Sequence, residues 1–437
     1  MKKLFNKTNL LAIGFCLFIF LFSYLIHINL GIPFFLILLY LCFYKRFTKN
    51  KAARLLNLNF LFLISFCLGY YLINQGLSFY FIPVTIIPML CVLLFNNPGV
   101  AYFLSLTTSI ALASLSPEPF KACFLFVTSC ICAILLVDQA RKRSQVIRAG
   151  IIAGALQLVG LILLEHFRIA HTQRYLVILI NGLLSGIITL GILPFFEYIL
   201  QTVTNISLLE LADFNQPILQ RMILEAPGTY HHSLVVGNLS DSACSAVGAN
   251  GLLARIGAYY HDIGKLQKPD YFIENQDINK NAHDELTPTM SKLIIMNHIK
   301  EGLELAKKYH LSPILWDFIQ QHHGNSLVYY FYRRALEGKE ENQEVSEEGF
   351  RYPGPKPNTK ETAIVLLADS VEAATRSLKD PAPDKIEETV HKVINNKFID
   401  GQLDECDLTL KDIEKISIIF IRILSGIYHS RVNYPQN

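Results

Sequence analysis

The motif Tyr-Tyr-His-Asp-Ile-Gly-Lys at residues 259–265 stands at the end of an apolar run from Leu252 to Tyr260. That run is long enough for a helix, so the imidazole of His261 and the carboxylate of Asp262 would stand at a helix end. An aspartate has two oxygens and can bridge two cations, whereas one imidazole nitrogen serves a single cation. A lone His-Asp pair is more often a surface hydrogen bond than a ligand set. Its surroundings therefore decide whether the pair is a metal site with Asp262 as the shared ligand.

The composition divides the chain into a membrane half and a soluble half. Of 437 residues, 51% are hydrophobic and only 17% are charged, which is too apolar for an ordinary soluble enzyme. Runs of Leu, Ile and Phe fill the chain up to about Gln201, and the charge density beyond it is that of a soluble domain. The net charge of +3, without a basic stripe and interleaved aromatic residues, argues against nucleic-acid binding. Seven of the nine cysteines precede residue 201, and buried free thiols explain them better than a disulfide framework.

The membrane half contains eight apolar segments, which predict about eight transmembrane helices within residues 1–200. They lie at residues 10–28, 31–44, 57–75, 77–95, 99–115, 119–138, 148–166 and 175–200, and a membrane helix needs about 20 apolar residues. The first is long for a signal peptide and lacks a small-residue cleavage site, so we expect it to be retained. The basic loops at 44–51 and 141–143 fall on one side of the membrane, and the positive-inside rule makes that side cytoplasmic. An even number of crossings then places everything after Gln201 in the cytoplasm, beneath the cell (inner) membrane.

The soluble half is predicted to be helical throughout. A helical connector at residues 201–216 continues the last membrane helix, and further helices follow at 217–226, 229–248, 251–261, 288–309, 312–323, 326–337, 360–378, 383–397 and 409–431. No alternating strand pattern occurs, so the fold class is all-α: a polytopic transmembrane helix bundle followed by a cytoplasmic all-helical domain at 217–437. The acidic stretch 337–348 and the Pro-rich segment 351–357 break the pattern and predict a solvated loop.

Ten of the thirteen histidines follow residue 200, and several stand on predicted helices or at their ends. With two carboxylates they form a candidate ligand set of His231, His232, His261, Asp262, His298, His322, His323 and Asp369. Separations of roughly 25 to 45 residues match one helix plus its connection, so each ligand would come from a different helix of a bundle. Five of these six imidazoles, together with the two carboxylates, suffice for two cations with an open position. The mixture suits iron or manganese better than a structural zinc site, which prefers thiolates.

The motifs around these residues resemble those of a known family. They comprise Glu-Ala-Pro-Gly-Thr-Tyr-His-His-Ser at 225–233, Leu-Ala-Arg-Ile-Gly-Ala-Tyr-Tyr-His-Asp-Ile-Gly-Lys at 253–265, Tyr-Phe-Ile-Glu-Asn-Gln at 271–276, Asn-His-Ile-Lys-Glu-Gly at 297–302, Gln-Gln-His-His-Gly at 320–324 and Leu-Ala-Asp-Ser-Val-Glu-Ala at 367–373. Together they closely resemble the membrane-anchored seven-helix HD-domain family, whose studied PgpH-type members are cyclic di-AMP phosphodiesterases. The resemblance covers nearly all of the soluble half. Family members usually carry a sizeable extracellular domain after the first membrane helix, and here that place holds only the short loop at 27–33.

The resemblance also implies the role of each candidate residue. It suggests that His232, His261, Asp262 and Asp369 bind one metal, and that Asp262, His298, His322 and His323 bind the other. His231 would either support a neighbouring ligand or be structural, and His283 would be structural rather than a ligand. Lys265 stands one helical turn or a tight bend after the His-Asp pair, where its ammonium could reach a non-bridging phosphate oxygen. We therefore expect Asp262 and Lys265 to be the catalytic residues.

The implied function is that of a membrane-bound, metal-dependent phosphodiesterase that hydrolyses cyclic di-AMP to pApA. Two cations that share Asp262 would lower the pKa of a bridging water, and the resulting hydroxide would attack phosphorus in line with the leaving 3′ oxygen. Cyclic di-GMP or another nucleotide ranks second as substrate, because Gly324 follows the double histidine where the related HD-GYP group has a glutamate. A non-catalytic nucleotide-binding membrane receptor would lack a metal ligand, and none is missing. The expected partners are a cyclic dinucleotide and membrane lipid, and the sequence leaves open the native metal, a homodimer and the signal that the membrane region senses.

Overall fold

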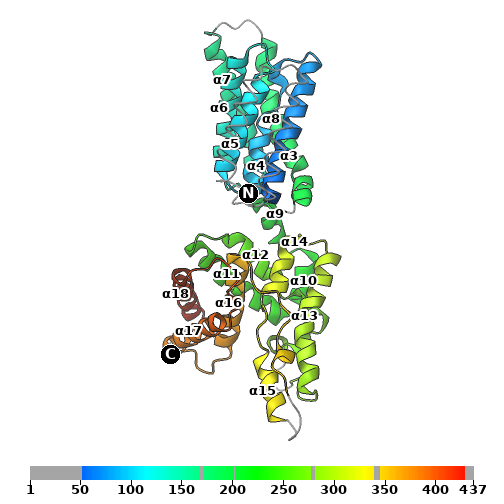
Figure 1. Cartoon of the computed structure of the whole chain (residues 1–437), viewed down its shortest axis with the longest axis vertical. Helices are drawn as coiled ribbons and strands as arrows, with labels where there is room; N and C mark the ends of the chain where they lie inside the picture. The colour runs from blue at the N-terminus through cyan, green and yellow to red at the C-terminus, as the bar shows by residue number, and fades with distance from the viewer. Residues whose placement is uncertain (1–51, 168–171, 201, 277–280, 339–344, 429–437) are drawn as a thin grey trace, which may run out of the picture. The chain divides into compact units, whose positions relative to one another are not determined.

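A computed structural model describes residues 52–167, 172–200, 202–276, 281–338 and 345–428. Within these ranges the regular structure consists of α-helices and short 3-10 helices, without a β-strand. The one β-pairing found there is an isolated bridge between Leu327 and Arg351. The predicted all-α fold class is therefore confirmed. The chain divides into two compact units, Met1–Ile206 and Ser207–Asn437, and each is described by itself (Figure 1).

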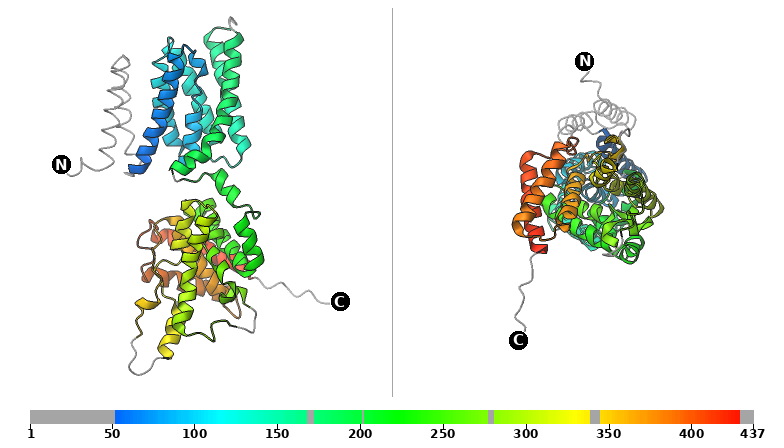
Figure 2. Two further views of the ribbon diagram at one scale, coloured as in Figure 1. Left: turned by 90° about the vertical axis from the view of Figure 1, so that its right-hand side faces the viewer. Right: turned by 90° about the horizontal axis from the view of Figure 1, so that it is seen from below.

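The described part of the first unit is a bundle of apolar helices. Its elements are α3 (Ala52–Asn74), η1 (Phe79–Phe81), α4 (Ile86–Phe95), α5 (Pro98–Ala113), α6 (Pro119–Val137), α7 (Arg143–Leu164) and α8 (Thr172–Leu200), which run side by side (Figure 2). Among the described residues, α6, α7 and α8 are long and apolar enough to cross a membrane, and shorter apolar helices occupy Leu61–Asn74, Phe79–Phe95 and Pro98–Ala113. The segments predicted at 10–28 and 31–44 lie outside the described residues, so the number of eight membrane helices stays a prediction.

Apolar side chains cover the outside of this bundle as well as its inside. Leu135 on α6 is 66% exposed and Leu163 on α7 is 53% exposed, while Leu125 and Leu161 of the same helices are fully buried. A helix that is apolar on every face belongs in a large core or in a membrane. α7 and α8 also approach closely, because a Cβ added to Gly154 would lie 2.9 Å from the Cα of Gly182. Such contacts between small residues are typical of membrane helix pairs.

The segment at 77–95 is predicted as one helix, and the structure corrects this prediction. A 3-10 turn at Phe79–Phe81 is followed by a break, and only then does α4 begin. Pro83 lies in the break, where it disfavours helical geometry at Ile82, and Ile82 is extended with φ −72° and ψ 118°. The side-chain amide of Asn181 on α8 donates hydrogen bonds of 2.9 Å to the carbonyl oxygens of Tyr80 and Ile82. It thereby satisfies backbone acceptors that the broken helix leaves free.

The connector also differs from the continuous helix predicted for 201–216. Residues 202–204 are not helical, and α9 (Asn205–Leu211) is a separate short helix. The backbone N–H of Thr204 donates to Oε1 of Glu197 at 2.8 Å, which turns the chain after α8. A second turn at 212–216 precedes the next helix, and in it the Asp213 side chain accepts a 2.9 Å hydrogen bond from the N–H of Asn215.

The second unit contains the helices that were predicted for the soluble half. They are α10 (Pro217–Glu225), α11 (Pro227–Ala246), α12 (Gly251–Tyr260), η2 (Ile263–Gln267), η3 (Pro269–Tyr271), η4 (Ile273–Asn275), α13 (Pro288–Lys308), α14 (Pro313–Gln321), α15 (Tyr329–Glu337), η5 (Glu348–Phe350), α16 (Lys360–Arg376), α17 (Pro383–Ile399) and α18 (Leu410–Ile427). Proline begins α10, α11, α13, α14 and α17, where its missing N–H costs no helical hydrogen bond. The predicted helix starts agree with these positions within a few residues.

The centre of the second unit is α16, which packs against α11, α12, α14, α17 and α18 (Figure 1). Residues 363–368 of α16 are all fully buried. A helix that is buried on every face holds its side chains firmly, because close packing leaves few alternative rotamers. Asp369 follows this buried run directly, so its carboxylate is presented from the most rigid element of the unit.

The segment 351–357 is predicted to be a solvated loop, and the structure shows that this is wrong for its beginning. Phe350 and Tyr352 are only 5% and 7% exposed. The N–H of Tyr352 donates to the carbonyl of Ser326 at 3.0 Å, and the N–H of Val328 donates to the carbonyl of Phe350 at 2.9 Å. The segment therefore pairs with the turn after α14 and directs its aromatic side chains inward. Of the acidic stretch 337–348, residues 339–344 lie outside the described residues.

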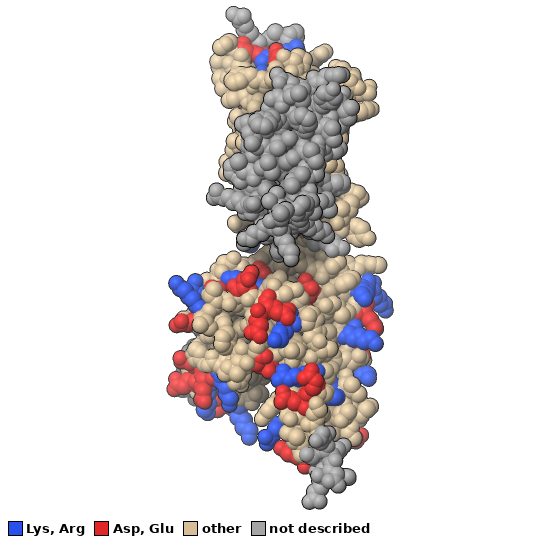
Figure 3. Space-filling view, in the orientation of Figure 1, with Lys and Arg blue, Asp and Glu red and all other residues tan. Residues whose placement is uncertain are grey.

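The charged side chains of the second unit lie on its surface in both signs. On the face seen in Figure 3, Lys and Arg alternate with Asp and Glu over this unit without forming a single-sign patch. A surface of this kind suits an aqueous environment. The ionisable side chains that could take part in a reaction are instead the few that are buried among α11, α12, α13, α14 and α16.

Candidate metal centre

Seven side chains from five helical segments meet in the interior of the second unit. α11 contributes one histidine, the ends of α12 and α14 contribute two residues each, and α13 and α16 contribute one residue each: His232, His261, Asp262, His298, His322, His323 and Asp369. Their donor atoms form two close groups, His232 with His261, Asp262 and Asp369, and His298 with His322 and His323. All are buried except His323, whose side chain is 21% exposed. The residues that the sequence singles out are thus brought together.

The carboxylate of Asp262 lies between the two groups. Its Oδ2 is 3.2 Å from Nε2 of His261 and 3.7 Å from Nε2 of His232. Its Oδ1 is 3.5 Å from Nε2 of both His298 and His322. The two oxygens of one aspartate therefore face different groups of imidazoles, which is the placement that a shared ligand of two cations requires.

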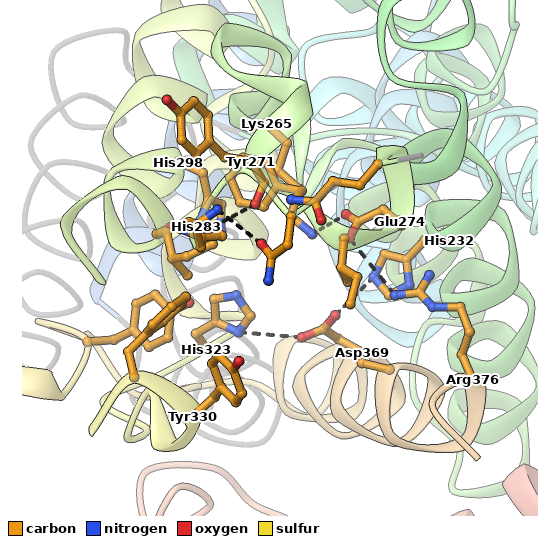
Figure 4. A pocket seen from close by; sticks show the side chains of 18 residues that line it. His232, Lys265, Tyr271, Glu274, His283, His298, His323, Tyr330, Asp369 and Arg376 are labelled. Carbon is orange, nitrogen blue, oxygen red and sulfur yellow. Dashed lines mark hydrogen bonds and ion pairs between the residues drawn. The ribbon is translucent and has the colours of Figure 1, made fainter. Parts of the chain in front are cut away.

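Asp369 occupies the edge of the first group. Its Oδ1 lies 3.0 Å from Nε2 of His232 and 3.8 Å from Nε2 of His261. Its Oδ2 lies 3.4 Å from Nδ1 of His323, and Figure 4 shows these two side chains facing each other across the pocket. Asp369 is thus close to donor atoms from α11, α12 and α14 at once.

Hydrogen bonds determine which nitrogen of each imidazole can bind a cation. In His261, the Nδ1 atom lies 2.6 Å from the carbonyl oxygen of Ala258. The Nδ1 atom of His298 lies 2.5 Å from the carbonyl oxygen of Ile295, and that of His322 lies 3.0 Å from the carbonyl oxygen of Phe318. A carbonyl can only accept, so these Nδ1 atoms carry the hydrogen and a neutral ring keeps its lone pair on Nε2. The Nε2 atoms of His298 and His322 are 3.1 Å apart. Two lone pairs at this distance repel unless a cation lies beside them, so the residues fit a metal.

Unpaired polar atoms give the same indication. Both carboxylate oxygens of Asp262 and Nε2 of His261 are buried and make no hydrogen bond. A buried polar atom without a partner costs free energy, and a buried carboxylate costs more. The Lys265 ammonium, 2.7 Å from Oδ2 of Asp262, offsets part of the charge. The carboxylate oxygens of Asp262 and Nε2 of His261 are atoms of the kind that divalent cations such as manganese and iron bind.

Protonation leaves the group of His298 ready to bind a metal, whereas in the group of His261 a proton and a metal would compete for the same nitrogen. Burial lowers the pKa of His298 to about 4, so its ring is neutral at physiological pH. Burial by itself would lower the pKa of His261 too, but the Asp262 and Asp369 carboxylates outweigh it and raise the pKa to about 10. Burial would raise the pKa of Asp262, yet His261 and Lys265 hold it well below its usual range. Cations in the first group therefore bind in competition with protons.

Lys265 lies beside the candidate ligand Asp262 and lines a cavity of about 450 Å³. Its Nζ is 2.7 Å from Oδ2 of Asp262 and 2.7 Å from Oε1 of Glu274, and it stands 5.0 Å above the ring of Phe272. The cavity is lined by His232, His298, His323 and Asp369 and also by Tyr271, Phe272, Tyr330, Phe331 and Tyr352. Candidate ligands and aromatic rings thus border one pocket (Figure 4).

Among the described residues, the other histidines of the soluble half do not join the cluster. His231 is exposed on α11, and His310 and His391 are exposed as well. His283 is buried and lines the cavity, but its Nε2 donates to the carbonyl of Tyr271 at 2.8 Å and it belongs to neither ligand group. His429 lies outside the described residues.

Two residues of this site were not predicted from the sequence. The ring of Tyr352 stacks on that of His323 with centroids 4.4 Å apart, and nothing in the surrounding Pro-rich sequence indicates an inward position. Glu372 lies 2.5 Å from Nδ1 of His232. Its spacing of one helical turn from Asp369 is a signal that could have placed it on the same helix face.

Comparisons with known proteins match both halves of the chain. The family described as a 7TM receptor with intracellular HD hydrolase matches residues 21–204, and the HD domain matches residues 229–374. The cyclic-di-AMP phosphodiesterase PgpH of Bacillus subtilis is 43% identical over 317 residues, which cover 71% of this chain and 44% of that protein. The protein of the same name from Listeria monocytogenes is 36% identical over 396 residues, which cover 89% of this chain and 54% of that protein. The chain thus spans about half the length of these curated relatives.

Solved structures of an HD domain match about half of the chain. The crystal structure of the L. monocytogenes phosphodiesterase PgpH HD domain is 47% identical, with a TM-score of 0.47, and the match covers 49% of this chain and all of that one. The same domain in complex with cyclic-di-AMP matches with the same identity and TM-score over 50% of this chain. The family description confirms the predicted localisation, a membrane region followed by an HD domain inside the cell. Because the two matched regions follow each other in the order that this description names, the chain belongs to the family of seven-transmembrane proteins with an intracellular HD domain.

Proposed function

We propose that this protein is a membrane-bound, metal-dependent phosphodiesterase that hydrolyses cyclic di-AMP to linear pApA. The observation that carries the proposal is the position of Asp262, whose two oxygens face different groups of imidazoles at 3.2 to 3.7 Å. The substrate is inferred from two relatives that bear the name cyclic-di-AMP phosphodiesterase and from the HD domain crystallised with cyclic-di-AMP. The cavity of about 450 Å³ has the size of a pocket for a small molecule.

The proposed ligand sets follow the two groups of donor atoms. His232, His261, Asp262 and Asp369 would hold one cation, and Asp262, His298, His322 and His323 would hold the other. Imidazole and carboxylate donors without a thiolate suit manganese or iron. When bound, two such cations supply hydroxide from water near neutral pH and neutralise charge on the phosphate.

The chain's own residues would orient the substrate. Lys265 is held by Asp262 and Glu274 with its ammonium at the cavity, where it can donate to a non-bridging phosphate oxygen as negative charge builds. Tyr271, Tyr330 and Tyr352 offer aromatic faces to the adenine bases, because base stacking on such rings is favourable. The apolar helices α6, α7 and α8 would keep the protein in the lipid bilayer.

The test uses the full chain, purified in detergent, stripped with a chelator and then reloaded with Mn²⁺. We expect two equivalents of bound Mn²⁺ and conversion of cyclic di-AMP to pApA, followed by chromatography. A His261→Ala/Asp262→Ala variant should lose both, while His391→Ala, which changes an exposed histidine on α17, should retain both. Turnover of cyclic di-GMP at a higher kcat/KM would overturn the substrate assignment. A protein that binds two Mn²⁺ but leaves every cyclic dinucleotide intact would overturn the activity.

A further inference from the structure

A buried glutamate contacts the imidazole of His232 from the central helix. Glu372 lies on α16 three residues after Asp369, so both carboxylates occur on one face of the helix. Its Oε2 is 2.5 Å from Nδ1 of His232, and its side chain is only 3% exposed. On the opposite side of the ring, Nε2 of His232 lies 3.0 Å from Oδ1 of Asp369. The imidazole is therefore held between two carboxylates that come from the same helix.

This arrangement distinguishes His232 from the three other deeply buried imidazoles. His261, His298 and His322 each direct Nδ1 to a carbonyl oxygen of a residue three or four positions earlier in the chain. Their orientation follows from the local backbone. The Nδ1 contact of His232 is instead a side-chain carboxylate that lies 140 residues further along the chain. A carboxylate carries a full negative charge, whereas a carbonyl carries a partial one. The carboxylate therefore also makes Nε2, the opposite ring nitrogen, a stronger ligand for a cation.

We propose that Glu372 is a positioning residue for the metal centre. Its carboxylate accepts a hydrogen bond from Nδ1–H of His232 and thereby directs the Nε2 lone pair toward the cation position that His232 would share with Asp262 and Asp369. The proposal rests on the metal centre of the proposed function, but not on its substrate. Without Glu372, Nδ1–H would lose its acceptor inside the protein, and the ring could rotate or carry its hydrogen on Nε2. Either change removes the lone pair from the first ligand group.

Arg376 connects Glu372 with the other side of the pocket. Nη1 of Arg376 lies 3.5 Å from Oε1 of Glu372, and Nη2 lies 4.0 Å from Oε2 of Glu274. Glu274 in turn contacts the Lys265 ammonium at 2.7 Å. The Arg376 side chain is 33% exposed at the cavity, so its two long contacts are weaker than the buried contact between Glu372 and His232.

The experiment compares Mn²⁺ binding by full chains in detergent that carry Glu372→Ala or Glu372→Gln. Free Mn²⁺ gives a sharp electron paramagnetic resonance signal, so titration of the stripped protein yields a dissociation constant for each site. For Glu372→Ala we expect one of the two sites to weaken about 10- to 100-fold, the usual effect of losing such an outer partner, while the other stays within a factor of two or so. Glu372→Gln should weaken the same site less, because its amide oxygen still accepts from Nδ1–H but carries no charge.

Glu387→Gln on α17 is the matched control, because this glutamate stands beside a histidine, His391, at 3.9 Å but is 61% exposed. Its two dissociation constants should equal those of the unchanged protein. Equal weakening of both sites in Glu372→Ala would indicate general loosening and overturn the proposal, as would two unchanged constants. If the alanine variant does not fold, the isosteric glutamine variant decides by the same criterion. An unchanged protein that binds Mn²⁺ but hydrolyses nothing would overturn only the proposed activity, because this test measures binding.

Discussion

At the scale of single residues, the side chains of the site are arranged by contacts that differ in kind. Backbone carbonyls orient His261, His298 and His322, whereas carboxylates from α16 surround His232. Lys265 is confined by two carboxylates and an aromatic ring, so its ammonium has little freedom. Confinement of this sort prepares a positive charge for the place where negative charge develops, and a group that is already in place need not reorganise during the reaction.

The first prediction concerns Lys265. Lys265→Ala should lower kcat for cyclic di-AMP by about 10²- to 10³-fold, because one preorganised donor to the transition state is lost. Bound Mn²⁺, measured by metal analysis, should remain at the level of the unchanged protein, since loss of a positive charge next to Asp262 does not remove a ligand. Lys265→Arg should recover part of the rate. Lys392→Ala, on an exposed position of α17, serves as control, and an unchanged kcat for Lys265→Ala would contradict the assigned role.

At the scale of elements, the site depends on close contacts between backbones. η2 carries the residues after the His-Asp pair and packs against α13, which carries His298. A Cβ on Gly264 would collide with the carbonyl oxygen of His298 and lie 2.6 Å from the backbone nitrogen of Gly302. Both obstacles are backbone atoms, which cannot move aside like the end of a side chain. The distance between Asp262 and His298 is therefore set by a glycine contact between two elements.

The second prediction follows from this contact. Gly264→Ala should force η2 away from α13, destabilise the second unit by about 1 to 3 kcal/mol as overpacking does, and reduce bound Mn²⁺. Thermal unfolding of the full chain and metal analysis provide the two measurements. Gly426→Ala on α18 is the matched control, because a Cβ there meets no atom within 4 Å, and alanine in a helix is at least as stable as glycine. If the two variants behave alike, the contact is not required.

The turn after α14 is held by a second set of contacts at this scale. Gln402, which is fully buried, accepts the N–H of Asn325 at 3.0 Å and donates to its side-chain oxygen at 2.6 Å. Arg351 donates to the carbonyl of Asn325 at 3.0 Å and to Asp400 at 2.8 Å. The turn directly follows His323, so these contacts restrict the position of the least buried residue in the metal cluster.

The third prediction tests this restraint. Gln402→Ala leaves the partly buried N–H of Asn325 without its acceptor and should lower the free energy of unfolding of the second unit by about 1 to 3 kcal/mol. Because His323 then moves more freely, kcat should fall as well, while one of the two Mn²⁺ dissociation constants should stay unchanged. Chemical denaturation and steady-state kinetics are the measurements. Asn395→Ala, an exposed change on α17, should leave both quantities as they were.

At the scale of the whole molecule, two units with separate cores lie in one chain. The core of the first unit is built from α3 to α8 and the core of the second from α11, α12, α14 and α16 to α18. The proposed metal ligands come from five segments of the second unit that span Pro227 to Arg376. No short piece of the chain holds the whole ligand set, so the complete site can exist only when this unit is folded. Metal binding and folding are then thermodynamically linked.

The fourth prediction is a consequence of that linkage. At a free Mn²⁺ concentration about 100 times the dissociation constant, metal should stabilise the second unit by about 2.7 kcal/mol, and a chelator should remove this contribution. Thermal unfolding of the full chain with Mn²⁺ and with chelator should show one transition that shifts and a second that does not. The His261→Ala/Asp262→Ala variant should show no metal-dependent shift. Identical unfolding of the unchanged protein under both conditions would contradict the linkage.

Local patterns in the sequence were sufficient for most of the described helices and for the division between apolar and charged halves, and the resemblance of the motifs to a known family supplied the residues that converge around Asp262. Apolar periodicity, proline at helix starts and the spacing of histidines are properties of neighbouring residues, so they can be read without a structure. Only the tertiary structure decided that Glu372 contacts His232, that Tyr352 stacks on His323 within a segment expected to be solvated, and that the helix expected at 77–95 is broken. These features depend on how distant segments pack. A pair separated by 140 residues is brought together by the whole fold, and no local pattern of side chains records it.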